Sequence, residues 1–527
     1  GEALAAHQQA WEELWRSCDF RVPGEPRVQL LLRLHTSHIL QVCSRHSADF
    51  DAGVPARGLN GEAYRGHIFW DELYVYPFLN FRLPEITREL LMYRYRRLGE
   101  ARAAAKEVGY NGAMFPWQSG SDGQEETQIV HLNPLSGRWD PDHSHNQRHV
   151  NAAIFYNVWR YYQATGDIEF MREYGAEMML ELARFWASIA DHNLERDRYE
   201  IHGVMGPDEF HEKYPGADEG GLRNNAYTNV MVAWIAEIAP RVLDLLPESR
   251  RDALRARLGL TDGELEIWRE MSHKMYIPFL EDGIISQFEG YEQLHELDWD
   301  AYRERYRNIQ RLDRILKAEG DDPDTYKLTK QADAVLLFFL FSDQELARLF
   351  ERLGYEYAPD AVRKTVEYYD RRTSHGSTLS FIAHAGVLAA TDPESSWERF
   401  LVALESDIGD VQGGTTKEGI HMGVMAGTLD LVQRFYAGAT VRDGALLFEP
   451  RLPDGLDGLE FAMQFHGMPL RVKIAGGELT IAADPEGQSR PVRVGIEDHV
   501  GELCPGDRWT VTLPTNPSLL TQRSQMP

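Results

Sequence analysis

The chain of 527 residues is poor in cysteine and poor in positive charge. Cys18, Cys43 and Cys504 are odd in number and widely scattered, which argues against a disulfide framework and against a cysteine-based metal site. Lys and Arg number 55 against 82 Asp and Glu, and the resulting formal net charge of −27 repels phosphate backbones and anionic lipid surfaces. Binding to nucleic acid or to a membrane surface is therefore disfavoured.

Long apolar runs are also missing. The run AVLLFFLF at 334–341 is far shorter than the ~20 residues that span a bilayer, and the opening stretch GEALAAHQQAWEEL has no signal-peptide pattern. These absences predict a cytoplasmic protein. The chain does contain 43% hydrophobic and 11% aromatic residues, which is enough for more than one packed core.

A helical period runs from the start of the chain to about residue 440. Apolar residues recur at spacings of three and four, and loops of Gly, Pro, Asn and Asp separate the helical segments. The expected helices are 87–107, 149–165, 171–192, 226–246, 360–371 and 421–436. No fixed repeat of about 20 to 50 residues is visible, which argues against a solenoid but permits a toroid of paired helices.

The pattern changes after about residue 441. Short runs such as LEFAMQFHG, LRVKIAGG and RWTVTLP alternate apolar and polar residues between turns, which predicts a small antiparallel β domain. We expect a helical linker at 1–25, a helical catalytic domain at 26–440, the β domain at 441–515 and a frayed tail at 516–527. The first helix has an aromatic face without an earlier partner, so we expect a further segment before residue 1.

Several loops in the helical part combine aromatic, acidic and amide side chains. Trp70 stands next to Asp71, Trp117 stands next to Gln118, and the segment RNNAYTN at 223–229 holds paired Asn residues. Aromatic faces stack on the apolar side of a pyranose, while carboxylates and amides bind its hydroxyls. One such loop alone is more often core with a solvated rim, but several in one chain favour a carbohydrate site.

Two further stretches place reactive groups beside turns or helix starts. GVMGPDEFHE puts Glu209 just after a Gly-Pro turn, where catalytic carboxylates are often held. TYKLTKQADAVLLFFLF puts Lys330 and Gln331 before a helix that is apolar all round, so these polar groups must meet a polar partner. The simpler reading of that segment is a capped helix with a solvent-facing lysine.

The segments RTSHGSTLS at 372–380 and VQGGTTKEGIH at 411–421 are suited to a small oxyanion. Each combines Gly with Ser or Thr and a nearby His or Lys, which exposes backbone N–H groups and hydroxyls. Neither matches the Walker motif, and either alone could be an ordinary turn. The clustered His143, His145 and His149 lack a clear ligand spacing, so a solvent-facing or substrate-facing loop is favoured over a metal site.

Taken in order, FWDE, GPDEFHE, NNAYTN, KQAD, HGSTLS and GGTTKEGIH resemble the glycoside hydrolase family 65 phosphorylases, which include maltose, trehalose and kojibiose phosphorylases. The resemblance runs from the first helix to the β domain. It implies an (α/α)6 barrel followed by a small C-terminal antiparallel β-sandwich, with the N-terminal β-sandwich of that family missing before residue 1. It also allows a homodimer.

The resemblance further implies roles for single residues. Glu209 would be the general acid that protonates the glycosidic oxygen while orthophosphate attacks the anomeric carbon in one inverting step, and Asp208 would only shape the turn. The expected substrate-binding residues are Trp70, Asp71, Trp117, Lys330 and Gln331. The expected phosphate-binding residues are His375, Ser377, Thr378, Gly414 and Thr415. No metal or organic cofactor is implied, and phosphate is a co-substrate.

The expected function is inverting phosphorolysis of an α-linked glucose disaccharide, of the trehalose or kojibiose type, to β-glucose 1-phosphate and an acceptor sugar. One alternative is an inverting α-glucoside hydrolase on the same fold. That reaction needs a second carboxylate roughly 6.5 to 9.5 Å from the acid, and the candidates are Glu72, Glu125, Glu126 and Glu418. The alternative without catalysis is a carbohydrate-binding homologue that has lost activity.

Overall fold

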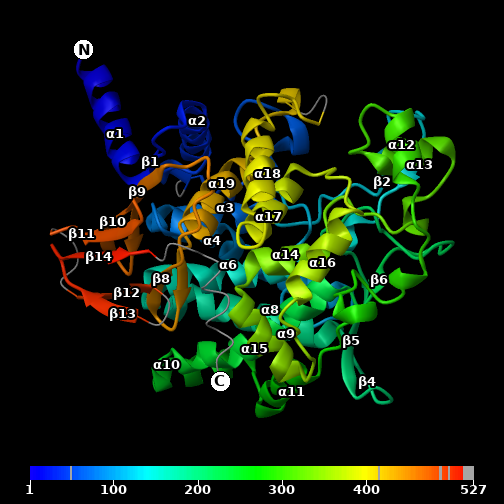
Figure 1. The fold of residues 1–527 in the computed structure, drawn as a ribbon. Helices are drawn as coiled ribbons and strands as arrows, with labels where there is room; N and C mark the ends of the chain where they lie inside the picture. The colour runs from blue at the N-terminus through cyan, green and yellow to red at the C-terminus, as the bar shows by residue number, and fades with distance from the viewer. Residues whose placement is uncertain (48–49, 413–415, 486–489, 497–498, 514–527) are drawn as a thin grey trace.

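The computed structural model describes residues 1–47, 50–412, 416–485, 490–496 and 499–513. Figure 1 shows a large helical body with a β domain packed on one side of it. The helices are α1 (Glu2–Cys18), α2 (Pro26–Val42), α3 (Glu72–Asn80), α4 (Pro84–Arg96), α5 (Leu98–Glu107), α6 (Val150–Thr165), α7 (Ile168–Phe170), α8 (Ala176–Ile189), α9 (Ala226–Asp244), α10 (Glu248–Leu258), α11 (Asp262–Lys274), α12 (Trp299–Arg305), α13 (Leu312–Glu319), α14 (Asp333–Leu340), α15 (Asp343–Leu353), α16 (Ala361–Asp370), α17 (Thr378–Leu388), α18 (Pro393–Glu405) and α19 (Met422–Asp430).

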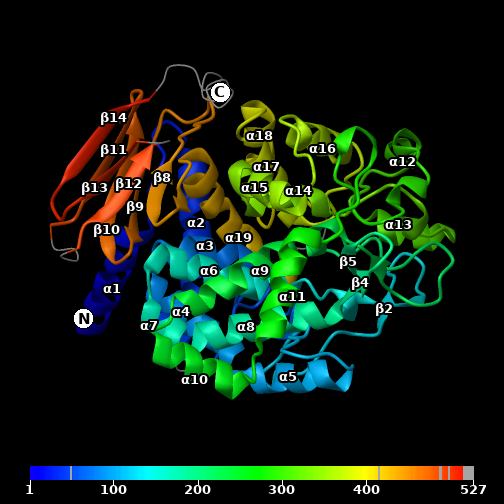
Figure 2. The same ribbon diagram turned by 90° about the horizontal axis from the view of Figure 1, so that it is seen from below.

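The helical body is a closed ring of paired helices. Within the described residues, α3, α6, α9, α14, α17 and α19 each pack against the next, and α19 returns to α3. Outer helices cover this inner ring, with α2 on α19, α4 on α3, α8 on α6, α11 on α9, α16 on α14 and α18 on α17. The fold is therefore the expected (α/α)6 barrel, and Figure 2 shows it beside the β domain from below.

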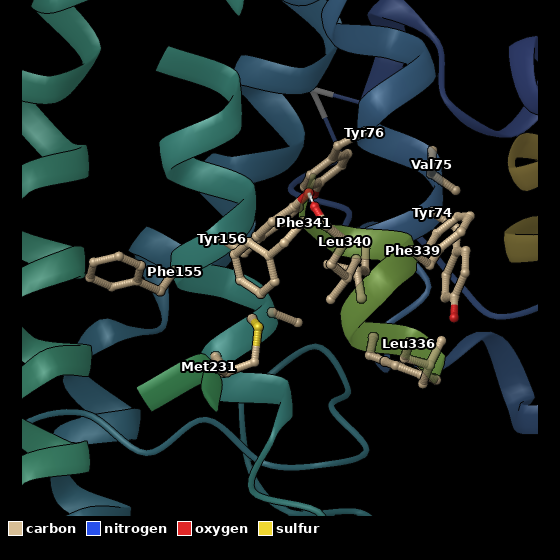
Figure 3. Close-up of a cluster of buried hydrophobic side chains, with 14 of the residues drawn as sticks. Tyr74, Val75, Tyr76, Phe155, Tyr156, Met231, Leu336, Phe339, Leu340 and Phe341 are labelled. Carbon is tan, nitrogen blue, oxygen red and sulfur yellow. Dashed lines mark hydrogen bonds between the residues drawn. The ribbon is translucent and has the colours of Figure 1, made fainter. Parts of the chain in front are cut away.

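The inner helices are apolar on all sides because they are enclosed on all sides. Every residue of α14 is buried, as its apolar sequence predicts. Figure 3 shows side chains of α3, α6, α9 and α14 meeting in one cluster, in which the Tyr156 hydroxyl donates to the Leu340 carbonyl at 2.8 Å. Gly423 lets α19 approach α3, since a Cβ there would lie 2.9 Å from Asp71 Oδ1. None of the helices in the described part of the chain is long and apolar enough to cross a membrane.

Most of the expected helices are present, with corrected limits. The segments 149–165, 226–246 and 360–371 form α6, α9 and α16. The segment 87–107 is divided into α4 and α5, and 421–436 forms α19 followed by a π-helical turn, η9 (Leu431–Tyr436). The prediction for 171–192 is wrong at its end, because Ala190–Asn193 leaves the helix to form strand β4, which pairs with β5 (Arg198–Val204).

The C-terminal domain is a sandwich of two sheets. One sheet has the order β1-β9-β10-β11-β14 and the other β13-β12-β8-β7. The strands are β1 (Phe20–Arg21), β7 (Thr440–Arg442), β8 (Ala445–Phe448), β9 (Gly458–Phe465), β10 (Met468–Ala475), β11 (Glu478–Ala483), β12 (Val492–Ile496), β13 (His499–Leu503) and β14 (Arg508–Thr512). The expectation of purely antiparallel pairing is wrong in one place, because β8 and β12 are parallel. The predicted tail at 516–527 lies outside the described residues.

Candidate active site

The inner helices begin at one end of the barrel. Their N-cap residues are Asp71 of α3, His149 of α6, Asn225 of α9, Ala332 of α14, Ser377 of α17 and His421 of α19. Neighbouring helix starts are in contact, since His421 Nε2 lies 3.6 Å from Asp71 Oδ1, and Asn225 Nδ2 donates to Asp333 Oδ2 at 2.6 Å. Helix N-termini carry partial positive charge and unpaired N–H groups, so this end of the barrel favours an anion.

Glu209 lies on the loop that follows β5. Its backbone has a φ of 45°, in the left-handed region that residues other than glycine rarely adopt. Backbone strain of this kind is common at functional sites. The Glu209 side chain is 34% exposed, and its Oε2 accepts a hydrogen bond from Lys330 Nζ at 2.8 Å. The structure thus brings together two of the residues singled out in separate sequence motifs.

Asp208 and His211 hold the Glu209 loop in place. Asp208 Oδ1 accepts the Lys330 backbone N–H at 2.6 Å, and Asp208 Oδ2 lies 2.6 Å from His211 Nδ1. His211 Nε2 lies 3.0 Å from the Tyr326 carbonyl oxygen, which can only accept, so Nε2 carries a proton. Burial alone would lower the pKa of His211, but the Asp208 carboxylate raises it above its usual value. Asp208 therefore acts on the shape of the loop.

Gln331 supports the same loop from the start of α14. Its Nε2 donates to the Pro207 carbonyl at 2.6 Å. Its Oε1 is buried and has no hydrogen-bond partner within the described part of the chain. A buried acceptor of this kind is costly unless it is satisfied, and a ligand hydroxyl is one group that could satisfy it.

The tryptophans expected to contact sugar are packed into the barrel wall. Trp70 and Trp117 are 4% and 6% exposed. Both face His149, with ring centroids 5.0 and 5.1 Å from its ring. Burial lowers the pKa of His149 to about 3, so this imidazole is neutral near pH 7. The structure brings Trp70 and Trp117 to the site end of the barrel but leaves little of either ring exposed for stacking.

Asp71 is a buried carboxyl group at the start of α3. Burial raises its pKa to about 7, although the nearby Arg57 guanidinium acts in the opposite direction. Asp71 Oδ1 has no hydrogen-bond partner among the described residues. It lies 3.6 Å from His421 Nε2, and the backbone N–H of Gly423 also acts on the carboxyl, so the polar groups around Asp71 come from the start of α19.

His421 is a site residue that the sequence analysis did not single out. Its Nδ1 lies 2.8 Å from Thr378 Oγ1, and its backbone N–H donates to Asp407 Oδ2 at 2.7 Å. Burial, together with Arg57 and Lys330, keeps the pKa of His421 well below its usual value, so it is a neutral hydrogen-bonding group. The sequence feature that could have identified His421 is its position at the end of GGTTKEGIH, directly before an inner helix.

The structure places only some of the expected phosphate-binding residues at the helix starts. Ser377 caps α17 and Thr378 contacts His421, so both lie at the helix starts. The His375 ring, in contrast, stacks on Phe381 at 4.7 Å and its Nδ1 lies 2.9 Å from Ser380 Oγ. His375 thus uses that nitrogen in packing the wall behind the helix start. The predictions for Gly414 and Thr415 fall outside the described residues.

Most carboxylates considered as a second catalytic base are engaged by the protein. Glu72 is 2% exposed, and its Oε1 accepts a hydrogen bond from Arg94 Nε at 3.1 Å. Glu125 accepts the backbone N–H of Trp117 at 3.0 Å. Glu418 pairs with Arg57 Nη2 at 3.2 Å. Only Glu126, which is exposed, remains of the four candidates.

No group of three or more His, Cys, Asp and Glu side chains in the described ranges is placed to hold a metal ion. His143 and His145 lie 6.5 Å apart by ring centroids, and His149 is enclosed by aromatic rings. The backbone N–H of His143 donates to Glu212 Oε2 at 3.1 Å, which ties this segment to the Glu209 loop. The histidine cluster is therefore part of the wall around the site.

Family models match nearly the whole chain. Residues 33–430 match the glycosyl hydrolase family 65 central catalytic domain, and residues 440–502 match the family 65 C-terminal domain. A solved structure from the human microbiome, provisionally described as a kojibiose phosphorylase, has the same fold, with a TM-score of 0.79 and 23% identity over 96% of this chain and 64% of that one.

Three relatives illustrate the similarity. An uncharacterized glycosyl hydrolase of Mycobacterium tuberculosis (strain ATCC 25618 / H37Rv) is 52% identical over 502 residues, which is 95% of this chain and 38% of that protein. The trehalose 6-phosphate phosphorylase of Lactococcus lactis subsp. lactis (strain IL1403) is 39% identical over 90% of this chain and 61% of its own length. The kojibiose phosphorylase of Halothermothrix orenii is 34% identical, with 91% and 59% covered. The chain thus spans between 38% and 61% of the length of these relatives.

Proposed function

The chain belongs to glycosyl hydrolase family 65, and from this membership we propose that it catalyses inverting phosphorolysis of an α-glucosidic disaccharide. The products are β-glucose 1-phosphate and an acceptor sugar. The observation that supports this most strongly is the partly exposed Glu209 carboxylate, which accepts from Lys330 near the starts of inner helices whose N-termini favour an anion.

The chemistry needs one acid and one anionic nucleophile. Glu209 gives its proton to the glycosidic oxygen, and the bond from that oxygen to the anomeric carbon breaks. A phosphate oxygen forms the new bond to the same carbon from the opposite face, which inverts the configuration. Phosphate is already nucleophilic, so no second carboxylate is required to activate it.

The surrounding groups divide into a sugar side and a phosphate side. Asp71 Oδ1 and Gln331 Oε1 are buried acceptors without partners among the described residues, which suits hydroxyls of the transferred glucosyl unit. Thr378, Ser377 and neutral His421 offer hydrogen bonds at the starts of α17 and α19, which suits orthophosphate. Lys330 lies between these groups and stabilises developing negative charge.

The proposed substrate is a class of sugar, the α-linked glucose disaccharides. The relatives named for a substrate share an α-glucosyl donor and differ in the acceptor, which is glucose 6-phosphate for one name and glucose for another. We therefore propose a trehalose-type or kojibiose-type linkage.

Hydrolysis is the second candidate and is less favoured. Glu72, Glu125 and Glu418 already accept hydrogen bonds from the protein itself, so activating water would require breaking one of these contacts. The exposed Glu126 is the candidate that remains open.

Product analysis with and without phosphate tests the proposal. The full-length protein is incubated with a panel of α-linked glucose disaccharides in the presence and in the absence of orthophosphate. Glucose 1-phosphate that forms only with phosphate supports the proposal, and the disaccharide consumed gives the linkage. Free glucose at equal rates in both incubations would identify a hydrolase instead.

A further inference from the structure

The segment that precedes α3 in the chain lies against the segment that leads into α19. Residues 56–61 and 418–422 run antiparallel to each other, and we call this pairing the clasp. Within it, the Gly58 N–H donates to the Ile420 carbonyl at 2.8 Å. His421, the residue directly before α19, belongs to the clasp. The clasp therefore ties the start of one inner helix to a segment that is far from it in the sequence.

Two glycines let the segments of the clasp approach each other. A Cβ at Gly61 would lie 2.2 Å from the Glu418 carbonyl oxygen, and a Cβ at Gly419 would lie 2.9 Å from the Gly61 Cα. Gly419 also has a φ of 114°, in the left-handed region that favours glycine. Asn60 Oδ1 accepts the Ile420 N–H at 3.3 Å. The clasp is therefore packed backbone to backbone, so that a shift of one segment moves the other.

Arg57 is the buried cation of the clasp. Its side chain is 6% exposed, Nη1 donates to the Gly419 carbonyl at 2.9 Å, and Nη2 donates to Glu418 Oε2 at 3.2 Å. Nη1 also lies 3.8 Å from Oδ1 of the buried Asp407. The other carboxylate oxygen of Asp407 accepts the His421 N–H at 2.7 Å. Arg57 and Asp407 together therefore hold the chain directly before α19 from two sides.

His421 carries this constraint into the candidate active site. Its two ring nitrogens lie 2.8 Å from Thr378 Oγ1 and 3.6 Å from Asp71 Oδ1. The imidazole thus stands between a hydroxyl proposed to bind phosphate and a carboxyl proposed to bind sugar. Burial raises the pKa of Asp71 and lowers that of His421, and the Arg57 charge lowers both. Arg57 therefore affects the site through its contacts and through its charge.

We propose that Arg57 and Asp407 are positioning residues, which hold His421 and the start of α19 where these groups can bind the attacking phosphate. The inference rests on the phosphorolysis proposed above. Both side chains are buried and contact the protein, so they act through His421. Glu209 and Lys330, which meet the leaving group, lie on other segments. A loosened clasp should therefore weaken the use of phosphate more than the use of the disaccharide.

Steady-state kinetics of two Arg57 variants test this. The full-length protein is assayed with the disaccharide found by the product analysis, and the concentrations of orthophosphate and disaccharide are varied separately. Arg57→Gln should raise the KM for orthophosphate about 10- to 100-fold, because misplacing a binding group by about 1 Å has effects of this size. The KM for the disaccharide should change far less. Arg57→Lys keeps the charge but not the planar donor pair, so it should recover part of the loss.

Two variants of Asp407 provide the same test without removing the buried cation, which matters if Arg57→Gln does not fold. Asp407→Ala removes the acceptor of the His421 N–H and should raise the KM for orthophosphate. Asp407→Asn keeps an amide oxygen that can accept this N–H, so it should raise that KM less. Equal KM values for orthophosphate in Asp407→Ala and the wild type would reject the role of Asp407.

The pH profile distinguishes positioning from simple support of the fold. Burial raises the pKa of Asp71, Arg57 lowers it and Glu72 raises it further, while Tyr74 and His421 face Asp71 as neutral groups. Asp71 can accept fully from a sugar hydroxyl only when it is ionised, so kcat/KM should fall as it takes up a proton. Arg57→Gln removes the opposing charge and should move this fall to higher pH. Arg57→Lys should keep it near the wild-type position.

Arg27→Gln is the matched control. Arg27 pairs with Glu405 at 2.9 Å, close in sequence to Asp407, but its side chain is 57% exposed. Its replacement should leave both KM values and the pH profile unchanged. Equal rises of the two KM values in Arg57→Gln, or a KM for orthophosphate that stays at the wild-type value, would overturn the inference.

Hydrogen exchange separates this inference from the proposed reaction. If the wild type forms no glucose 1-phosphate, the phosphorolysis fails, and the exchange rates of the backbone amides over 416–430 then decide whether the clasp positions α19. Faster exchange confined to that segment in Arg57→Gln and Asp407→Ala supports the inference. Wild-type rates in the segment, or faster exchange throughout the barrel, would reject it.

Discussion

Glu209 combines a strained backbone with an ion-pair partner, and both features bear on its proposed role. The left-handed backbone at φ 45° directs its side chain toward Lys330, and the contacts of Asp208 hold that geometry. A general acid must reach the leaving oxygen while it carries a proton. In this structure the carboxylate instead accepts from Lys330, which places a cation next to the proposed acid.

Replacing Glu209 should remove turnover and keep sugar binding. Glu209→Gln has the same shape but no transferable proton, so kcat for a natural disaccharide should fall about 10²- to 10⁴-fold. The loss should be much smaller with α-glucosyl fluoride, whose leaving group needs little protonation. Glu219→Gln, an exposed residue on the same loop, serves as the control. Unchanged kcat in Glu209→Gln would remove this residue from the mechanism.

Asp71 should set the acidic limb of the pH profile. Its pKa is raised to about 7, chiefly by burial, so below pH 7 the free enzyme carries a protonated Asp71 that has lost acceptor capacity for sugar hydroxyls. The kcat/KM should therefore fall as pH drops through about 7, by about tenfold per unit. Asp71→Asn should lack this limb at a low residual activity. Asp122→Asn, at an exposed position, should retain the limb. A limb that persists in Asp71→Asn would assign the titration to another group.

At the scale of secondary-structure elements, α3 and α4 are joined by a buried ion pair. Arg94 is fully buried, donates to both oxygens of Glu72 and gives Nη2 to the Phe69 carbonyl at 2.7 Å. This contact fixes the start of α3, and therefore Asp71, relative to the outer helix. Glu72 is thereby assigned to the scaffold.

Breaking that pair on one side should destabilise the fold. Arg94→Met leaves the Glu72 carboxylate buried without a counter-charge, so the free energy of unfolding should drop by about 3 to 5 kcal/mol. The double variant Glu72→Met/Arg94→Met removes both charges and should recover most of the loss. Denaturant unfolding measures both variants. Equal destabilisation in the single and double variants would show that the charge itself is not the cause.

At the scale of the whole molecule, the barrel was predictable because its signals are local. An inner helix such as α14 is apolar on all sides, and the period of three and four residues marks the outer helices. The order of the motifs predicted Glu209 and Lys330 as site residues, and the fold brings these two side chains into contact. The parallel pairing of β8 with β12 was missed, because strand partners depend on the path of the chain between them.

The remaining parts of the site depend on contacts between segments that are far apart in the sequence. His421 meets Asp71 only because α19 returns to α3 at the end of the ring. The His375 ring stacks on Phe381 and its backbone has a φ of 52°, and no local pattern in SHGS reveals either feature.

The seam between the barrel and the β domain is made of aromatic rings around one arginine. Phe20 of β1, Phe78 of α3 and Phe461 of β9 surround Arg82, whose Cζ lies 4.8, 5.5 and 4.9 Å from their ring centroids. Arg82 is fully buried with no side-chain hydrogen bond to any described residue, and burial lowers its pKa to about 10. Its charge is therefore stabilised by the ring faces together with the Asp430 carboxylate.

This seam should make the two domains unfold together. Phe461→Ala removes a ring that is 1% exposed and one of the three faces around Arg82, so it should cost about 3 to 5 kcal/mol. Because Phe461 packs against Phe20, the thermal transitions of barrel and β domain should shift down as one. Phe50→Ala, at a position 78% exposed, should change stability by less than about 0.5 kcal/mol. Two separate calorimetric transitions in the wild type, with Phe461→Ala moving only one, would mean that the β domain folds independently of the barrel that carries the site.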